Sequence, residues 1–351
     1  MKKIIPIITA ISLVLVLAAC GKAFPASDDV ETETPPVVSE EPVIYTNPLT
    51  GEIVEKEPEN TRPFAVMINN ISVALPHCGT SQADIVYEIL AESDITRMLA
   101  IFSDVSDVEK IGSMRSARPY YIDVALSYDA IYVHAGGSDQ AYSDISTKNV
   151  SSLDGVRTTF NSNVFYRDPN RMSQGYEHSM FTSGEGILAG VDEKGYELMH
   201  DGNKYDYGLV FAKDGENVAM TDSVPAADVD VSFGGLKNTR LSYDSSTGLY
   251  TPEEYGNTII DGNSNEPLQF KNVLIVNADT KIVDDYGRRS VNLIGEGTGK
   301  FICDGKCIDI TWKRGGSNEP FRYYADGKEL TLAVGKSYIA VVPTESEIGL
   351  A

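Results

Sequence analysis

The spacing of the apolar runs changes near residue 205, and this change constrains the fold more than any other feature of the sequence. Before that point, apolar runs such as 64–68, 98–102 and 130–135 alternate with segments that suit helices. After it, short apolar runs follow one another with Asp-Gly and Gly-Gly turn signals between them. Alternating strands and helices indicate an α/β layer, and successive strands joined by turns indicate an antiparallel sandwich or open barrel. The sequence therefore predicts an α+β protein, with an N-terminal α/β layered domain followed by a mainly antiparallel β domain.

Individual elements of the first domain follow from residue patterns. Apolar residues at helical spacing predict a helix over residues 81–92. Pro119 suits the first turn of a helix that we expect to end near residue 127, and another helix is expected to begin near Asp139. The remaining apolar runs are expected strands, at residues 64–68, 98–102, 110–114 and 130–135.

The composition changes along the chain predict five segments. Roughly 330 residues after a signal peptide exceed a typical single domain, so two domains are expected. The predicted segments are a lipoprotein signal peptide (1–20), a disordered acidic Pro-rich tether (21–60), the α/β domain (61–205), a linker (206–227) and the β-rich C-terminal domain (228–351).

The first twenty residues have the pattern of a signal peptide. Two lysines precede an apolar run, 4–17, which is shorter than the roughly 20 residues of a membrane span. The run ends in Leu-Ala-Ala-Cys20, which resembles a bacterial lipobox; the alternative is an ordinary secretory cleavage site with an incidental cysteine. A diacylglycerol on Cys20, with a further acyl chain such as palmitate, gives the two-chain attachment that holds a protein stably on a membrane. We therefore expect a lipid-anchored protein at the extracytoplasmic face of the bacterial cell membrane.

The mature chain is expected to be strongly acidic. Loss of the two signal-peptide lysines leaves 27 basic and 51 acidic residues, so the net charge changes from -22 to -24. A polyanion of this kind repels nucleic acid at long range, so we expect no nucleic-acid partner. Residues 21–60 hold ten acidic and two basic residues and little apolar surface, which predicts a disordered tether.

Three cysteines follow Cys20, an odd number that cannot pair completely within one chain. Residues 301–308 have the pattern of a hairpin around an Asp-Gly turn. With a three-residue loop, Cys303 and Cys307 face each other and can form a disulfide; with a two-residue loop they lie on opposite faces and cannot. Because no second ligand pair accompanies them, we expect no metal site, and no cofactor is expected either.

The predicted α/β domain, residues 61–205, is rich in arginine. It holds seven arginines and four lysines, whereas the rest of the chain holds five arginines and thirteen lysines. The planar guanidinium binds carboxylate or phosphate oxygens in pairs, so this bias suggests oxyanion recognition. Arg115 and Arg118 lie between a strand end and a helix start, where free backbone N–H groups also favour anions. The alternative is that these arginines pair with the many acidic residues nearby.

Further candidates for anion or ligand binding lie near these arginines in sequence. Gly136-Gly137-Ser138 occupies a similar strand-to-helix position, where the alternative is a plain turn. His134 ends the preceding strand, where ligands commonly bind in α/β layers, although a satisfied core histidine is the more common case. Arg167 and His178 lie on predicted loops, which often carry function when a rigid sheet holds them.

Strings in both predicted domains match motifs of a known family. They include NPLTGE (47–52), RPFAVMINN (62–70), KIGSMRSARPYYID (110–123), AIYVHAGGS (130–138) and DDYGRRSVNLIGEGTG (284–299). These strings resemble the YerB-like family of bacterial lipoproteins, which has two domains of unknown function. The resemblance implies the two-domain architecture and a lipid-anchored location, but no reaction.

The resemblance also carries over to single residues. The family's arginine-containing motifs correspond here to Arg97, Arg115, Arg118 and Arg167, and its His-Ala-Gly-Gly-Ser motif to 134–138. The chain departs from the family at three places: Glu-His-Ser at 177–179 replaces a Pro-His-Asn tendency, Tyr338 replaces a tryptophan, and Pro252 stands where an arginine is expected.

The leading functional hypothesis is a binding or regulatory module of the cell envelope that recognises an anionic group through the arginines of the first domain. The sequence has no GxSxG or HExxH motif. The alternative is an envelope enzyme, a phosphotransferase or hydrolase of a phosphorylated or cell-wall glycan substrate, with His134 or Asp84 as acid or base. A third hypothesis has the β domain dock a partner at a strand edge. Expected partners are the membrane, through the lipid, and a cell-wall precursor, glycan or envelope protein.

Overall fold

The structure, a computed structural model, describes residues 44–55, 60–202, 204–213 and 215–351. Residues 44–351 form one compact unit. The predicted signal peptide, the lipid-attachment residue Cys20 and the tether up to residue 43 lie outside the described residues. Within the described ranges, no helix is both long and apolar enough to cross a membrane.

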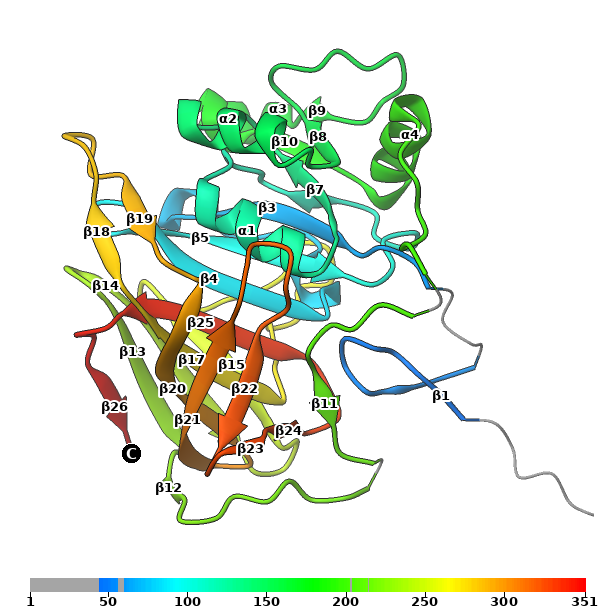
Figure 1. The fold of residues 1–351 in the computed structure, drawn as a ribbon. Coiled ribbons are helices and arrows are strands. Elements are labelled where there is room, and N and C mark those ends of the chain that lie inside the picture. Colours follow the sequence, from blue (N-terminus) through cyan, green and yellow to red (C-terminus); the bar gives the residue numbers. More distant parts are fainter. Residues whose placement is uncertain (1–43, 56–59, 203, 214) are drawn as a thin grey trace, which may run out of the picture. The chain divides into compact units, whose positions relative to one another are not determined.

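One large mixed sheet runs through the unit and joins both predicted domains (Figure 1). Strand β25, from near the C-terminus, lies parallel between β17 and β4, so the C-terminal strands continue directly into the N-terminal ones. Strand β12 (Val224–Pro225) pairs with β21 beside this path. In sheet order the strands are β23 (Lys328–Glu329), β22 (Arg322–Ala325), β21 (Lys306–Arg314), β20 (Gly295–Cys303), β17 (Asn272–Ala278), β25 (Ser337–Pro343), β4 (Ile85–Glu92), β5 (Ile95–Phe102), β3 (Phe64–Asn70), β7 (Ile131–His134) and β8 (Ser152–Asp154).

A second, antiparallel sheet packs on one face of the large sheet. Its strands in order are β16 (Asn257–Thr258), β15 (Leu249–Glu254), β14 (Lys237–Asp244), β13 (Asp228–Gly234) and β26 (Ile348–Leu350). Val229, Val231 and Phe233 alternate along β13 and are fully buried against residues such as Val66 and Val86 of the large sheet. This alternation is the pattern of a strand with one buried face, so the C-terminal part is a sandwich built on a shared sheet.

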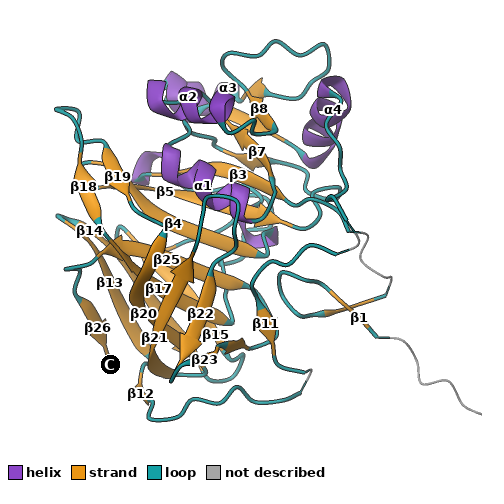
Figure 2. Ribbon diagram, viewed as in Figure 1, coloured by secondary structure: helices purple, strands orange, loops and turns teal. Residues whose placement is uncertain are grey.

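The α-helices of the described residues all lie between residues 119 and 194 (Figure 2). They are α1 (Pro119–Ser127), α2 (Asp139–Thr147), α3 (Pro169–Met172) and α4 (Gly184–Lys194). Helix α1 begins at the predicted proline and buries Tyr120, Tyr121 and Val124 against the face of the large sheet opposite the second sheet. Small pairings complete the unit: β1 (Tyr45–Thr46) with β2 (Ile53–Val54), β6 (Ile111–Gly112) with β10 (Met180–Thr182) and β9 (Tyr166–Arg167), β11 (Val210–Phe211) with β24 (Thr331–Leu332), and β18 (Thr280–Ile282) with β19 (Arg289–Val291).

The helix predicted over residues 81–92 is wrong. Only the 3-10 turn η2 (Thr80–Gln82) is helical there, and residues 85–92 form strand β4. The strand is central in the sheet and buried on both faces from Ile85 to Ala91, so its apolar residues form a nearly continuous run. Such a run carries no period-2 signal, and a helical spacing then arises by chance.

The predicted disordered tether is too long at its C-terminal end. Residues 45–54 form the β1–β2 hairpin, and Leu49 at its turn is fully buried. Asn47 fixes this turn by donating its side-chain amide to Asp84 Oδ1 at 3.0 Å and to Ser103 Oγ at 3.1 Å. One apolar side chain and a few polar contacts therefore order a segment whose average composition is typical of disorder.

The cysteines of the C-terminal hairpin are not bonded to each other. Cys303 pairs with Lys306 and Cys307 with Ile302, which leaves a two-residue turn. Asp304 and Gly305 have φ of 51° and 71°, the positive values that a tight two-residue hairpin turn requires. The two thiols therefore lie on opposite faces of the sheet and are free. The prediction for a two-residue loop is confirmed, and a disulfide between Cys303 and Cys307 is wrong.

Candidate functional site

The segment 113–118 is the centre of the predicted site. It lies between the end of β3 and the end of β7, since Asn69 N donates to Ser113 O at 2.9 Å and Ala135 N donates to Arg115 O at 3.0 Å. Strands β3 and β7 are parallel, so this segment lies at carboxyl ends of a parallel pair. That position commonly holds ligands in α/β layers.

Glu92 joins two of the predicted arginines. Its carboxylate accepts a hydrogen bond from Arg97 Nη2 at 2.8 Å and forms a close ion pair with Arg118 Nη2. A β-bulge between Leu90 and Glu92 shifts the register of β4 against β5. Simple alternation would put Glu92 on the same face as Leu90, whereas the bulge turns it toward the face of Arg97.

Arg97 and Arg118 are buried, with exposed fractions of 4% and 7%. Arg97 Nη1 also donates to Ser116 O at 2.7 Å, and Arg118 Nη1 donates to Ala117 O at 2.6 Å. Burial lowers the pKa of both guanidinium groups. Arg97 and Arg118 therefore both pair with an acidic residue, Glu92, which is the alternative to ligand binding that the sequence left open.

Arg115 is held differently. Its guanidinium is half-buried, and Arg115 Nη1 makes one long hydrogen bond of 3.4 Å, to Glu177 O. Burial, and then the nearby positive charge of Arg97, lower the pKa of Arg115 to about 10. The group stays charged at neutral pH, and among the described residues it forms no ion pair with a carboxylate. Arg115 is therefore the arginine with the most remaining capacity to bind an anion.

Two arginines of the C-terminal part join this site and were missed from the sequence. Arg289 Nη2 donates to Ser93 O at 2.7 Å, and Arg288 forms an isolated bridge with Glu92 and an ion pair with Asp284 at 2.9 Å. They belong to the β18–β19 hairpin, which lies beside the turn between β4 and β5 (Figure 1). The string 284–299 carried a family signal, but nothing local placed it near residue 97. We call Arg97, Arg115, Arg118, Arg288 and Arg289 the arginine cluster.

The arginine cluster contains buried donors without acceptors. Arg118 Nε and Arg289 Nε are buried and make no hydrogen bond to any described residue, and the same is true of the Tyr132 hydroxyl. A buried N–H group without a partner costs free energy, so these donors favour the binding of an acceptor such as water or an anion.

His134, at the end of β7, and the glycine pair that follows it lie beside segment 113–118. His134 is fully buried, its Nδ1 lies 2.8 Å from Gly136 O, and burial lowers its pKa, so the ring is neutral at pH 7. Gly136 has φ of +79° and donates its N–H to Asp154 Oδ1 at 2.9 Å. Ser138 caps α2 by accepting a hydrogen bond from Ala141 N at 3.2 Å. These contacts are those of a turn and a helix cap, and Gly137 lies in the same turn, beside Ala117.

Arg167 and His178 lie on the same loop region but differ in their contacts. The Arg167 guanidinium stacks 3.5 Å from the centroid of the Tyr176 ring and donates to Ser179 Oγ at 3.1 Å. His178 Nδ1 lies 2.9 Å from the Asn69 amide, and burial and the charge of Arg115 lower its pKa. His178 therefore adjoins the arginine cluster, whereas Arg167 organises the loop.

Asp84, proposed above as an acid or base, lies at the opposite end of β4 from Glu92. It precedes the strand and accepts hydrogen bonds from Ser103 N and from the Asn47 amide. The structure therefore does not bring Asp84 together with the arginines. Within the described ranges, no group of three or more His, Cys, Asp or Glu side chains is arranged to hold a metal ion.

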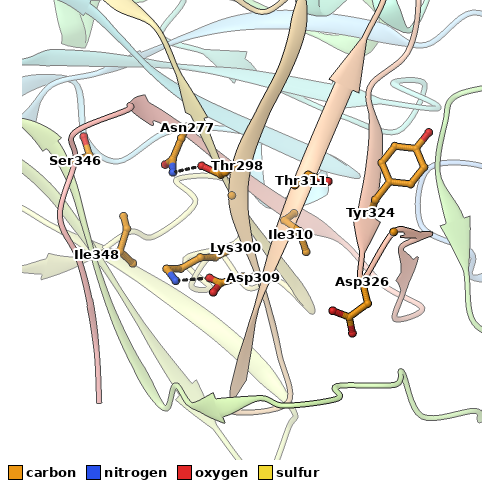
Figure 3. Close-up of a pocket in the computed structure, with 12 residues that line it drawn as sticks. Asn277, Thr298, Lys300, Asp309, Ile310, Thr311, Tyr324, Asp326, Ser346 and Ile348 are labelled. Atoms are coloured by element: carbon orange, nitrogen blue, oxygen red, sulfur yellow. Dashed lines mark hydrogen bonds and ion pairs between the residues drawn. The ribbon is translucent and has the colours of Figure 1, made fainter.

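Two cavities lie away from the arginine cluster. One, of about 610 Å³, is lined by residues of β17, β20, β21 and β22, by the turn at 326–327 and by Ser346 and Ile348 (Figure 3). Four of its polar side chains form two pairs: Asn277 donates to Thr298 at 3.1 Å, and Lys300 donates to Asp309 at 2.7 Å. The other, of about 1170 Å³, lies between the β1–β2 hairpin and residues 204–213. Neither cavity is lined by a predicted site residue.

Comparisons with known proteins agree over most of the chain. Residues 49–197 match the model of a protein of unknown function (DUF3048), N-terminal domain, and residues 229–339 match that of its C-terminal domain. The chain is 33% identical over 303 residues to "Putative lipoprotein YerB" of Bacillus subtilis (strain 168), covering 84% of this chain and 86% of that protein. The crystal structure of the YerB protein from Bacillus subtilis superposes with a TM-score of 0.73 at 31% identity, covering 87% of this chain and 99% of that chain.

Proposed function

The chain belongs to the DUF3048 family, and we propose that it is a lipid-anchored module of the cell envelope that binds an anionic group at the arginine cluster. The location is supported by the lipobox-like sequence that ends at Cys20 and by the name of the relative, a putative lipoprotein. The role as a binding or regulatory module is supported by the arrangement of charge around segment 113–118.

The observation that carries the proposal is the surplus of positive charge. Five guanidinium groups gather where Glu92 and Asp284 are the carboxylates that form ion pairs with them. Two buried Nε–H groups, of Arg118 and Arg289, have no acceptor among the described residues. An oxyanion supplies both the missing negative charge and the missing acceptors, and bidentate arginine contacts are a common way to hold one.

The arginines divide into supporting and binding residues. Arg97 and Arg118 are buried and fixed by Glu92, so they set the local potential and the shape of the site. Arg115 is half-buried and weakly bonded, so it can move its hydrogen bonds to a ligand with little cost. Because burial has already restricted its side chain, less conformational entropy is lost on binding than for an exposed arginine.

A titration of the full-length protein with inorganic phosphate, and separately with acetate, tests the proposal by NMR chemical-shift changes. Arg115→Ala is expected to weaken binding of the preferred anion at least tenfold, since a hydrogen bond to a charged group contributes about 1.5–3 kcal/mol. Its melting temperature should stay close to that of the native protein. Arg118→Ala should instead lower the melting temperature, because it leaves Glu92 with one partner fewer.

Arg240→Ala is the matched control, since the Arg240 side chain is half-exposed and pairs with Asp228 on the second sheet. It is expected to bind the anion as the native protein does. Equal loss of binding in Arg115→Ala and Arg240→Ala, or no binding of either anion by the native protein, would contradict the proposal.

A further inference from the structure

A buried polar network links the two sheets, on the face of β4 opposite to the one toward which the bulge turns Glu92. It consists of Asn70, Glu88, Lys237 and Glu254, from strands β3, β4, β14 and β15. Their exposed fractions are 0%, 0%, 3% and 1%. The network therefore joins the large sheet to the second sheet inside the sandwich, and its Lys237 also borders a cavity of about 310 Å³ on the second sheet. We call these four residues the buried amide–amine network.

The amide of Asn70 and the amine of Lys237 share both carboxylates. Asn70 Nδ2 donates to Glu88 Oε1 at 3.1 Å and to Glu254 Oε1 at 2.9 Å. Lys237 Nζ forms ion pairs with Glu88 Oε1 at 3.1 Å and with Glu254 Oε2. Since Nζ and Nδ2 each lie 3.1 Å from the same Glu88 oxygen, they are no more than about 6 Å apart. Bond formation requires a rotation about the torsions of the long lysine side chain that moves Nζ from the shared Glu88 oxygen to Asn70 Cγ.

The charges of the network differ in role. Burial acts to raise the pKa of Glu88, but Lys237 and hydroxyl donors such as Thr96 outweigh it, so Glu88 remains an anion. Burial, and then the charge of Glu88, raise the pKa of Glu254 to about 8. A carboxyl group that titrates near neutral pH can both accept and return a proton, which is the property of a general acid–base group.

Asn70 is the uncharged member of the network, so it does not contribute to the ion pairs. Its amide nitrogen lies between the two acids, while its Oδ1 is buried without a hydrogen-bond partner among the described residues. Lys237 and Asn70 each contact both carboxyl groups of the network. A lysine, an asparagine and a carboxyl group buried together in a β sandwich are the components of an amide-forming reaction. We propose that Lys237 and Asn70 form an intramolecular isopeptide bond, with Glu254 as the catalytic residue, which joins the two sheets covalently.

The reaction needs no further reagent. In the form in which Glu254 is ionised, Lys237 Nζ passes one proton to the Glu254 carboxylate, and the neutral amine attacks Asn70 Cγ. The Nζ–Cγ bond forms, and the Cγ–Nδ2 bond breaks with its electron pair on the nitrogen. Glu254 transfers a further proton from Nζ to Nδ2, which leaves as ammonia and takes up the first proton as ammonium. The products are one secondary amide and one ammonium ion, and Glu254 is regenerated as a carboxylate.

Peptide mass spectrometry of the full-length protein after trypsin digestion tests the proposal. The expected result is a linked pair of peptides that contain Asn70 and Lys237, with the mass of one ammonia molecule missing and no cleavage after Lys237. Glu254→Gln keeps both reacting side chains, so its Lys237 should be cleaved and its peptides unlinked. Asn277→Ala, at an exposed hydrogen-bonded asparagine of the shared sheet, is the control and should keep the linked pair.

Efficient cleavage after Lys237 in the native protein, with both peptides at the masses of the sequence, would overturn the proposal. This readout needs only the native protein, so it holds even where a variant fails to fold. If Glu254→Gln still gives linked peptides, the bond forms without Glu254, and Glu254 is not the catalytic residue.

Discussion

Strand β4 carries two glutamates, Glu88 and Glu92, whose surroundings differ in one decisive respect. Glu88 lies in a closed network with Lys237, Glu254 and hydroxyl donors, and all of these groups are buried. Glu92 lies in the arginine cluster, where positive groups outnumber the negative ones and Arg115 is only half-buried. We infer from the comparison that buried charges of both signs in balance hold sheets together, whereas a surplus of one sign around a half-buried arginine favours the binding of an anion.

The β-bulge before Glu92 creates this difference. Without the shift of register, Glu88 and Glu92 would share one face of β4 and both would point at the second sheet. The bulge turns Glu92 toward α1 and segment 113–118 instead. One inserted residue therefore separates a structural cluster from a candidate binding site on the same strand.

The largest effect is expected from Lys237→Met, which tests the closed network. In chains whose Lys237 is not linked to Asn70, it leaves Glu88 and Glu254 buried without their cation, and breaking a buried ion pair in this way costs about 3–5 kcal/mol. Urea unfolding measures the loss. Lys300→Met is the matched control, because Lys300 pairs with Asp309, whose side chain is 87% exposed, and such pairs contribute at most about 1 kcal/mol. Similar losses of unfolding free energy in Lys237→Met and Lys300→Met would contradict the contrast between the buried network and an exposed ion pair.

Glu92→Gln tests the arginine cluster and should act in two directions. It removes the carboxylate shared by Arg97 and Arg118, so the free energy of unfolding should fall by about 2–3 kcal/mol, since hydrogen bonds to charged groups are lost. It also removes a competitor for an anion, so phosphate should bind about tenfold more tightly, which corresponds to about 1.4 kcal/mol. Weaker phosphate binding in Glu92→Gln would show that the surplus charge does not act on the ligand.

The sequence predicted those parts of the fold that depend on local signals. Strands 64–68 and 98–102 and the helix that begins at Pro119 are confirmed, because their signals are apolar runs and a proline at a helix start. The helix over residues 81–92 is wrong, because burial on both faces removes the alternation that identifies a strand. The continuation of the sheet through β25 depends on pairing between distant segments, which no local pattern encodes.

The candidate site was predicted in the same uneven way. Arg115, Arg118 and His178 come together because segment 113–118 and the loop at 177–179 meet at the end of β3. Arg288 and Arg289 could not be placed, because only the docking of the β18–β19 hairpin brings them to Glu92. The bulge was equally hidden, since one extra residue in a buried strand leaves no mark on composition or period.

A pH titration of stability sharpens the comparison, because it affects the Glu88 network and leaves the guanidinium groups charged. Folding raises the pKa of Glu254 from 4.5 to about 8, so the folded chain binds more protons than the unfolded chain between these values. The free energy of unfolding should therefore fall as pH rises, by about 1–2 kcal/mol between pH 6.5 and 8. This window lies above the one in which His77, with a pKa lowered from 6.5 to about 4 by burial, acts in the opposite direction.

Denaturant unfolding at closely spaced pH values measures this slope. Glu254→Gln should have a flatter profile between pH 6.5 and 8, while Arg115→Ala should keep the slope of the native protein. A native profile that rises over this window would exclude Glu254 as the titrating group.

The smallest effect on stability is expected from Arg115→Lys, and it separates charge from geometry at the half-buried arginine of the cluster. The half-buried Arg115 makes one long hydrogen bond, so replacing it should change the free energy of unfolding by no more than about 0.5 kcal/mol. Lysine keeps the positive charge but lacks the planar pair of donors, so phosphate should bind several-fold more weakly than to the native protein yet more tightly than to Arg115→Ala. Native affinity in Arg115→Lys would mean that the cluster attracts anions through its net charge alone. If Arg115→Lys loses as much affinity as Arg115→Ala, the paired donors of Arg115 determine phosphate binding. The surplus charge that distinguishes this cluster from the Glu88 network would then contribute little to it.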